Sequence, residues 1–151
     1  MNKQYLMDEA AKLAPPSAET ADEYAKKHEK LAAELNRLFS GRSDLELLIG
    51  AGNQAMMEDN HRNHGRFMAS FLTSFNPEVL VETVLWVFRA YRNHGFQLTY
   101  WPAQLDLWLL LMKRELSPEA YQEIEPVYRF MLFHQPTFAA LTNPNTPDHI
   151  P

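Results

Sequence analysis

Two histidines stand three positions apart in a segment whose apolar residues follow the spacing of one helix face. This seam consists of Met57, His61, His64, Met68, Phe71 and Phe75. Because the intervals are four and three positions, the six residues share one face, and both imidazoles should lie among apolar side chains. Imidazoles at i and i+3 can share a metal ion, and a buried imidazole can bind the polar end of a ligand.

Two further predicted helices carry a histidine on an apolar stripe. The first stripe is Leu80, Val84, Val87, Tyr91 and His94, and the second is Val127, Met131, His134 and Phe138. Two interpretations of the inward imidazoles stay open. Each is a packed structural group that hydrogen-bonds a neighbour, or some of them line a pocket and bind a metal, a haem iron or a polar ligand group.

A ligand pocket, if present, is expected between three of the predicted helices. Its candidate residues are His61, His64, Met68, Tyr91, His94 and Trp108. Methionine and aromatic side chains form a plastic apolar lining, which suits a lipophilic molecule with a fatty-acid-like tail whose carboxylate an imidazole would bind. The alternative is a haem or metal site that uses His94 together with His64 and His61.

Other catalytic patterns are missing from the sequence. The chain has no cysteine, which excludes disulfides, thiolate nucleophiles and thiolate metal sites. It has no glycine-rich phosphate loop, no His-Glu-x-x-His and no Gly-x-Ser-x-Gly. Glu58 and His61 form one Glu-x-x-His pair, but a di-iron site needs two. We therefore expect a protein that is not an enzyme and needs no cofactor.

Composition narrows the class of partner. With 151 residues and 46% hydrophobic content, the chain fits one globular domain. The formal net charge of −5 argues against nucleic acid, and no cluster of Lys and Arg indicates a membrane surface. The longest apolar run, residues 107–112, is far too short to span a bilayer. No signal peptide is recognisable at Met1, so we expect a cytoplasmic protein.

Helix start signals recur, whereas strand signals are nearly absent. Thr20 and Ser43 each begin a capping-box pattern, and Asn76 and Ser117 are each followed by proline and glutamate. These signals predict a single all-α domain of about six helices over residues 1–151. Its core is expected over residues 19–138, with an N-terminal arm at 1–16 and a loose tail at 142–151.

Two consecutive predicted helices are apolar around most of their circumference. They cover residues 77–94 and 100–116. One small domain cannot easily surround both, so we expect a homodimer in which one or both contribute to the interface. The helix that starts near Ser43 is expected to break near residues 50–53 or 58–60, where glycines or polar residues gather.

The order of these helices resembles the globin family over about residues 19–138. A long helix with His64 is followed by a turn, by a helix that ends at His94, and by two more long helices. In haem globins a distal and a proximal histidine are spaced as His64 and His94 are, so the resemblance implies a pair of haem ligands.

Residues 50–60 contain no aromatic that would wedge a porphyrin, and His94 stands beside the helix-ending Gly95. The chain is therefore more similar to the non-haem globin-like sensor domains of bacterial stress-signalling regulators. That resemblance implies a dimeric, non-enzymatic sensory domain that works by contact with a regulatory protein or by binding a small lipophilic molecule.

Overall fold

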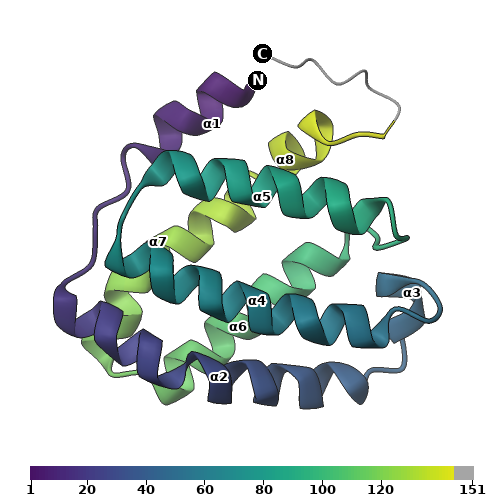
Figure 1. Ribbon diagram of the computed structural model, residues 1–151, viewed down its shortest axis with the longest axis horizontal. Helices are drawn as coiled ribbons and strands as arrows, with labels where there is room; N and C mark the ends of the chain where they lie inside the picture. The colour runs from purple at the N-terminus through teal and green to yellow at the C-terminus, as the bar shows by residue number, and fades with distance from the viewer. Residues whose placement is uncertain (145–151) are drawn as a thin grey trace.

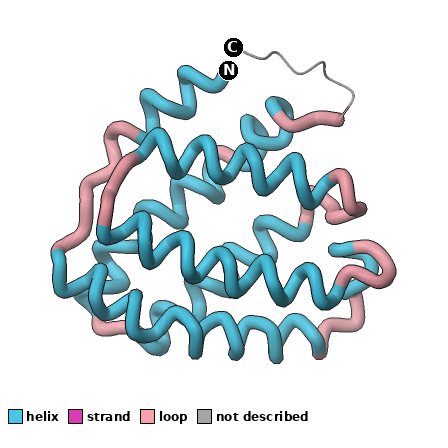
Figure 2. Tube along the Cα trace, viewed as in Figure 1, coloured by secondary structure: helices cyan, strands magenta, loops and turns pink. Residues whose placement is uncertain are grey.

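Eight α-helices and no strand make up residues 1–144, the part of the chain that the computed structural model describes (Figures 1 and 2). Helices account for 77% of that part, as the absence of strand signals predicts. The helices are α1 (Lys3–Ala10), α2 (Ala18–Ser40), α3 (Leu45–Ile49), α4 (Gln54–Thr73), α5 (Pro77–Arg92), α6 (Tyr100–Glu115), α7 (Pro118–Phe133) and α8 (Gln135–Leu141).

The helices pack around one hydrophobic core. In Figure 1, α2, α4 and α5 form the front of the molecule, and α6 and α7 cross behind them. Helix α2 packs along α4 and also contacts α6 and α7, while α1 and α8 both pack against α5. The core cluster runs through the chain from Leu6 of α1 to Phe138 of α8. The N-terminal arm predicted from the sequence is thus part of the core, because Leu6 and Ala10 are fully buried.

Glycine allows the close approach of α2 and α4. A Cβ atom added to Gly65 of α4 would stand 2.8 Å from Nδ1 and 3.3 Å from Cβ of His28, on α2. The His28 side chain occupies the space that a Cβ at Gly65 would need, so glycine lets α2 and α4 pack closely here.

The two helix starts predicted from an N-cap residue followed by proline are confirmed, whereas the two predicted capping boxes do not form. Asn76 and Ser117 cap α5 and α7 by accepting from the backbone N–H of Glu78 and Ala120. Helix α2 instead begins after Ser17, whose hydroxyl accepts from the Thr20 N–H. Glu23, the residue expected to complete a capping box with Thr20, accepts hydrogen bonds from the backbone N–H and hydroxyl of Ser117 at 2.6 and 2.9 Å.

Ser43 does not cap a helix either: α3 begins at Leu45 with no side-chain cap. The break between α3 and α4 lies at residues 50–53, the first of the two places expected. Gly50 has φ of 84°, and a Cβ there would stand 3.3 Å from the carbonyl oxygen of Gly95. The Nδ2 atom of Asn53 donates to the carbonyls of Ile49 and His94, both at 2.7 Å, which ties this turn to the turn after α5.

The last helix, α8, is not foreseen by the sequence pattern as a separate element. The chain bends after His134, and Pro136 stands in the first turn of the new helix. Thr142, the first residue of the expected loose tail, is buried, and its hydroxyl donates to the carbonyl of Phe138 at 2.7 Å. The rest of that tail, from residue 145 on, lies outside the described residues.

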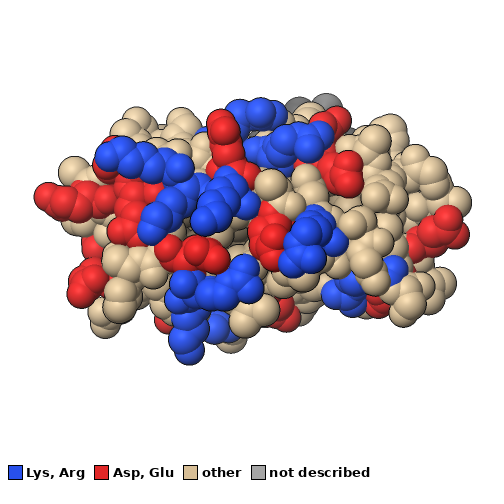
Figure 3. Space-filling view, turned by 90° about the horizontal axis from the view of Figure 1, so that it is seen from below, with Lys and Arg blue, Asp and Glu red and all other residues tan. Residues whose placement is uncertain are grey.

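The outer face along α2 carries charges of both signs. Figure 3 shows Lys and Arg interspersed with Asp and Glu on the face seen from below. Exposed ion pairs such as Lys26 with Asp22 at 2.8 Å account for part of this pattern. Within residues 1–144, no helix combines the length and the apolar character that a membrane crossing requires.

Candidate ligand pocket

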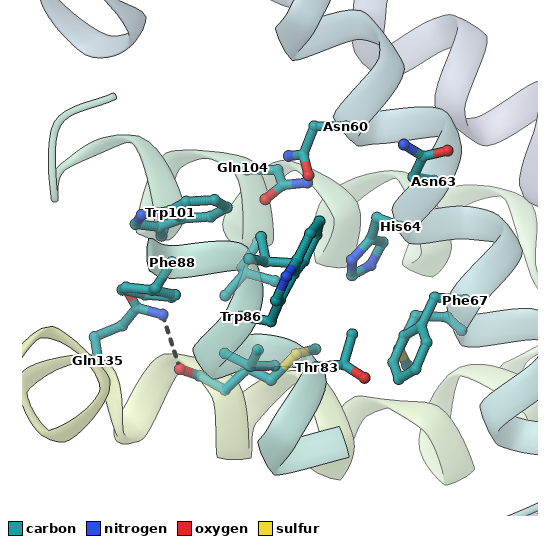
Figure 4. A pocket seen from close by; sticks show the side chains of 15 residues that line it. Asn60, Asn63, His64, Phe67, Thr83, Trp86, Phe88, Trp101, Gln104 and Gln135 are labelled. Atoms are coloured by element: carbon teal, nitrogen blue, oxygen red, sulfur yellow. Dashed lines mark hydrogen bonds between the residues drawn. The ribbon is translucent and has the colours of Figure 1, made fainter. Parts of the chain in front are cut away.

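An apolar pocket of about 260 Å³ lies between α4, α5 and α6, with α7 and α8 at its far side (Figure 4). Among the described residues its lining contains no Asp, Glu, Lys or Arg. A wider hollow between α2 and α4, of about 600 Å³, is of the opposite kind because Glu29, Glu58, Arg62 and Arg66 line it. The pocket residues are Asn60, Asn63, His64, Phe67, Met68, Thr83, Val84, Trp86, Val87, Phe88, Trp101, Gln104, Leu105, Met131 and Gln135.

Helical periodicity brings these side chains to common walls. On α4 the lining residues recur at Asn60, His64 and Phe67, and on α6 at Trp101 and Gln104, one turn apart in each case. Helix α5 turns Thr83 and Trp86 toward α4. Trp86 is 66% exposed although it lines the pocket, so its indole stands at the mouth.

His64 is tied to the far side of the core by a chain of hydroxyl groups. Its Nε2 lies 2.7 Å from the Tyr128 hydroxyl, which lies 2.9 Å from the Tyr24 hydroxyl. The ring also packs against Trp108, with centroids 4.8 Å apart. Burial lowers the pKa of His64 from 6.5 to about 3, so the imidazole is neutral at physiological pH.

The donor and acceptor roles in this series of hydrogen bonds follow from Tyr24, the residue at its buried end. Among the described residues the Tyr24 hydroxyl has only Tyr128 as a hydrogen-bond partner, so it is paired as a donor only when Tyr128 accepts from it. Tyr128 then donates to Nε2 of His64. We assign the remaining ring proton of His64 to Nδ1 on this ground.

His61 is a structural residue. Its Nδ1 lies 2.5 Å from Oδ1 of Asn36, an oxygen that can only accept, so Nδ1 carries the proton. Its Nε2 accepts from the Tyr100 hydroxyl at 2.8 Å, and that hydroxyl accepts from Asn60. Burial, followed by the neighbouring His64 and Arg62, lowers the pKa of His61 to about 3. Both ring nitrogens are in use, and the ring does not line the pocket.

Gln104, a lining residue, carries an unpaired donor. Its Nε2 is buried and has no hydrogen-bond partner within residues 1–144, and the residue is only 2% exposed. Figure 4 shows its carboxamide beside Asn60. The indole N–H of Trp101, another lining residue, is likewise buried without a partner in that part of the chain. By contrast, Nε2 of Gln135 donates to the Met131 carbonyl at 2.9 Å (dashed in Figure 4).

Of the six residues predicted for the pocket, His64 and Met68 line it. Trp108 is buried behind His64, and His61 and Tyr91 are buried elsewhere in the core. The inward orientation predicted for His94 is wrong, because α5 ends at Arg92 and His94 is exposed in the following turn. That turn uses the carbonyl of His94, which accepts from Asn53, rather than its ring.

Sequence reasoning missed Gln104, Trp86 and most of the other lining residues. A signal for Gln104 exists: it follows Trp101 by three positions and precedes Trp108 by four, so a polar amide interrupts an apolar helix face.

The inward orientation predicted for the imidazoles of His61 and His134 is confirmed, since His61 is fully buried and His134 is 5% exposed. His134 packs against Tyr5 and Phe130, away from the pocket, and burial lowers its pKa.

The three histidines of the alternative reading do not fit a haem or a metal ion. His61 has no free nitrogen, and His94 is exposed outside the pocket. Residues 1–144 contain no group of three or more His, Asp or Glu arranged to hold a metal. A cavity of about 150 Å³ accommodates benzene, so a haem of about forty non-hydrogen atoms needs on the order of 1,000 Å³. The pocket offers about 260 Å³.

Comparisons of the chain with models of protein families, with curated proteins and with solved structures give no match. The resemblance to globin-like sensor domains therefore stays a prediction from helix order. What the protein does has to be inferred from the pocket and its surroundings.

Proposed function

We propose that this protein is a non-enzymatic sensory or regulatory domain that binds a small apolar molecule in the pocket between α4, α5 and α6. The observation that carries the proposal is an apolar pocket of about 260 Å³ whose lining includes Gln104, a residue with a buried, unpaired donor. Protein cores are close-packed, and pockets with apolar walls and a few polar groups are the usual form of small-molecule sites.

The lining favours binding over catalysis. In the part of the chain that the structure describes, His64 is the one ionisable side chain of the lining, and its Nε2 is hydrogen-bonded to Tyr128. General acid–base catalysis needs a group that titrates near the working pH, whereas burial lowers the pKa of His64 to about 3. A group kept neutral and already hydrogen-bonded orients a ligand better than it exchanges protons.

Helix α5 supplies a route from the pocket to a partner. Trp86 lines the pocket and is also 66% exposed, and Val79, two turns earlier on the helix, is 45% exposed. A ligand that fixes the Trp86 indole changes the outer surface of α5. Contact of that surface with a second copy of the chain or with a regulatory protein would then depend on the ligand.

Native mass spectrometry of freshly purified protein tests the proposal. We expect retained small molecules, or a mass increase on addition of butylbenzene, together with a higher melting temperature. Trp86 fluorescence should respond to the same additions, and the exposed variant Leu47→Ala, remote from the lining residues, should behave as the wild type. The proposal is wrong if no lipophilic compound binds or raises the melting temperature.

A further inference from the structure

We infer that the ligand is an uncharged, mainly apolar molecule of about ten non-hydrogen atoms that carries one hydrogen-bond acceptor, such as the carbonyl oxygen of a ketone or ester, which accepts from Gln104. This inference rests on the proposed function and specifies the chemical class that the pocket takes.

The size follows from the volume. An engineered apolar cavity of about 150 Å³ binds benzene, which has six carbon atoms. In the same proportion the pocket, at about 260 Å³, holds about ten non-hydrogen atoms. Aromatic and aliphatic walls, with Phe67 and Phe88 among them, suit an apolar body of that size.

The acceptor follows from Gln104. A buried amide N–H without a partner is unfavourable, and among residues 1–144 nothing accepts from this one. Gln135, the other glutamine of the lining, shows the usual arrangement, since its Nε2 donates to a backbone carbonyl. A ligand oxygen beside Gln104 would supply the missing hydrogen-bond acceptor.

His64 adds a donor and no free acceptor. Tyr128 donates to its Nε2, so the ring proton is on Nδ1. A ligand group that can only donate therefore finds no partner on this imidazole. The acceptor group of the ligand is therefore assigned to Gln104 and not to this imidazole.

The absence of charge follows from the lining as a whole. Within residues 1–144 no Lys or Arg lines the pocket, and His64 is neutral, so no group in that part of the chain would compensate a buried carboxylate. The structure thus disfavours the carboxylate that the sequence led us to expect. The acidic and basic side chains of this region line the separate hollow between α2 and α4.

Three probes of equal size, about ten non-hydrogen atoms each, separate these chemistries: butylbenzene, propiophenone and phenylacetate. Calorimetric titration at pH 7 should show propiophenone binding about tenfold more tightly than butylbenzene, because it pairs the Gln104 donor. Phenylacetate should bind most weakly. Equal affinity for the hydrocarbon and the ketone, or tightest binding of phenylacetate, would overturn the inference.

Two glutamine variants localise the effect. Gln104→Leu should bring the ketone-to-hydrocarbon affinity ratio close to one while butylbenzene still binds. Gln97→Leu removes an exposed amide outside the pocket, whose donor is already used by the Gly95 carbonyl, and the ratio should stay near its wild-type value. A preference for the ketone that survives Gln104→Leu would also overturn the inference. Failure of all three probes to bind the wild type would instead refute the proposed function.

Discussion

Tyr128 of α7 hydrogen-bonds His64 of α4, with 2.7 Å between the hydroxyl oxygen and Nε2. The same hydroxyl also hydrogen-bonds Tyr24 of α2. Three helices thus meet at one line of hydrogen-bonded polar atoms beside the pocket. Because every member of the line depends on the Tyr128 hydroxyl, that oxygen stabilises the fold and also fixes which nitrogen of His64 carries a proton.

Tyr128→Phe should therefore destabilise the protein. The change leaves the buried Tyr24 hydroxyl without a partner, at a cost of about 1–3 kcal/mol, and it also removes the partner of the half-buried Nε2 of His64. Urea unfolding would measure the difference. Tyr121→Phe is the matched control, since that hydroxyl donates to Glu125 in a partly exposed position and its loss should have a smaller effect. Equal effects of the two variants would contradict the buried chain.

Stability should fall as the pH decreases from 6.5 toward 3. Burial lowers the folded-state pKa of His61 and His64 to about 3, while the unfolded imidazoles titrate near 6.5, so below 6.5 the unfolded state binds protons that the folded state does not. His61 should contribute a loss of roughly 2 kcal/mol between pH 7 and 5. The share of His64 is the smaller one, because it faces the pocket.

Urea unfolding at a series of pH values between 7 and 5 measures this loss. His64→Gln, which keeps a group able to bind Tyr128, should reduce the slope of the unfolding free energy against pH. His94→Gln is the control for loss of an exposed imidazole. If the slope is unchanged in His64→Gln, the imidazole is not kept neutral by burial.

Met68→Trp should fill the pocket and abolish probe binding at modest cost in stability. Met57→Trp provides the comparison, because Met57 is on the same seam and equally buried but does not line the pocket. Overpacking there should destabilise the protein by about 1–3 kcal/mol. Thermal unfolding and butylbenzene titration of both variants test whether Met68, unlike Met57, borders an open pocket. Equal destabilisation with no wild-type binding would show that the space near Met68 does not accept a side chain or a ligand.

Gly65→Ala should destabilise the protein although alanine favours helices by about 1 kcal/mol over glycine. The new Cβ would stand 2.8 Å from Nδ1 of the buried His28, so the His28 side chain or the two helices have to shift. We expect a net loss of about 1–3 kcal/mol in unfolding free energy. The double change His28→Ala with Gly65→Ala should recover part of it by removing the clash. A stabilised single variant would mean that the helices have room to adjust.

The protein should be a dimer that uses the outer face of α5. Sedimentation at micromolar concentration tests this, and Val79→Glu should shift the population to monomer because it puts a charge on that face without touching the pocket. Leu47→Glu, on the exposed side of α3, should leave the dimer intact. A wild-type monomer with no tendency to associate would contradict the prediction.

Local signals located most of the helices. Asn76 and Ser117 cap α5 and α7 as predicted, because an N-cap side chain followed by proline acts within one turn of backbone. The predictions that Thr20 and Ser43 cap helices were wrong. For Thr20 the reason lies in the tertiary structure. The Glu23 carboxylate that would complete the Thr20 box accepts hydrogen bonds from Ser117, 94 positions away in the chain.

The sequence by itself determined the helical class and the buried seam of α4, because residues three and four positions apart share a face in any α-helix. It also marked His61 and His64 as inward. Only the tertiary structure decided that His61 is fully hydrogen-bonded within the core, that His94 is exposed, and that the Gln104 donor lies unpaired in the pocket wall. Periodicity tells which face of a helix is apolar, whereas the partner of each polar atom depends on which distant helices pack against that face.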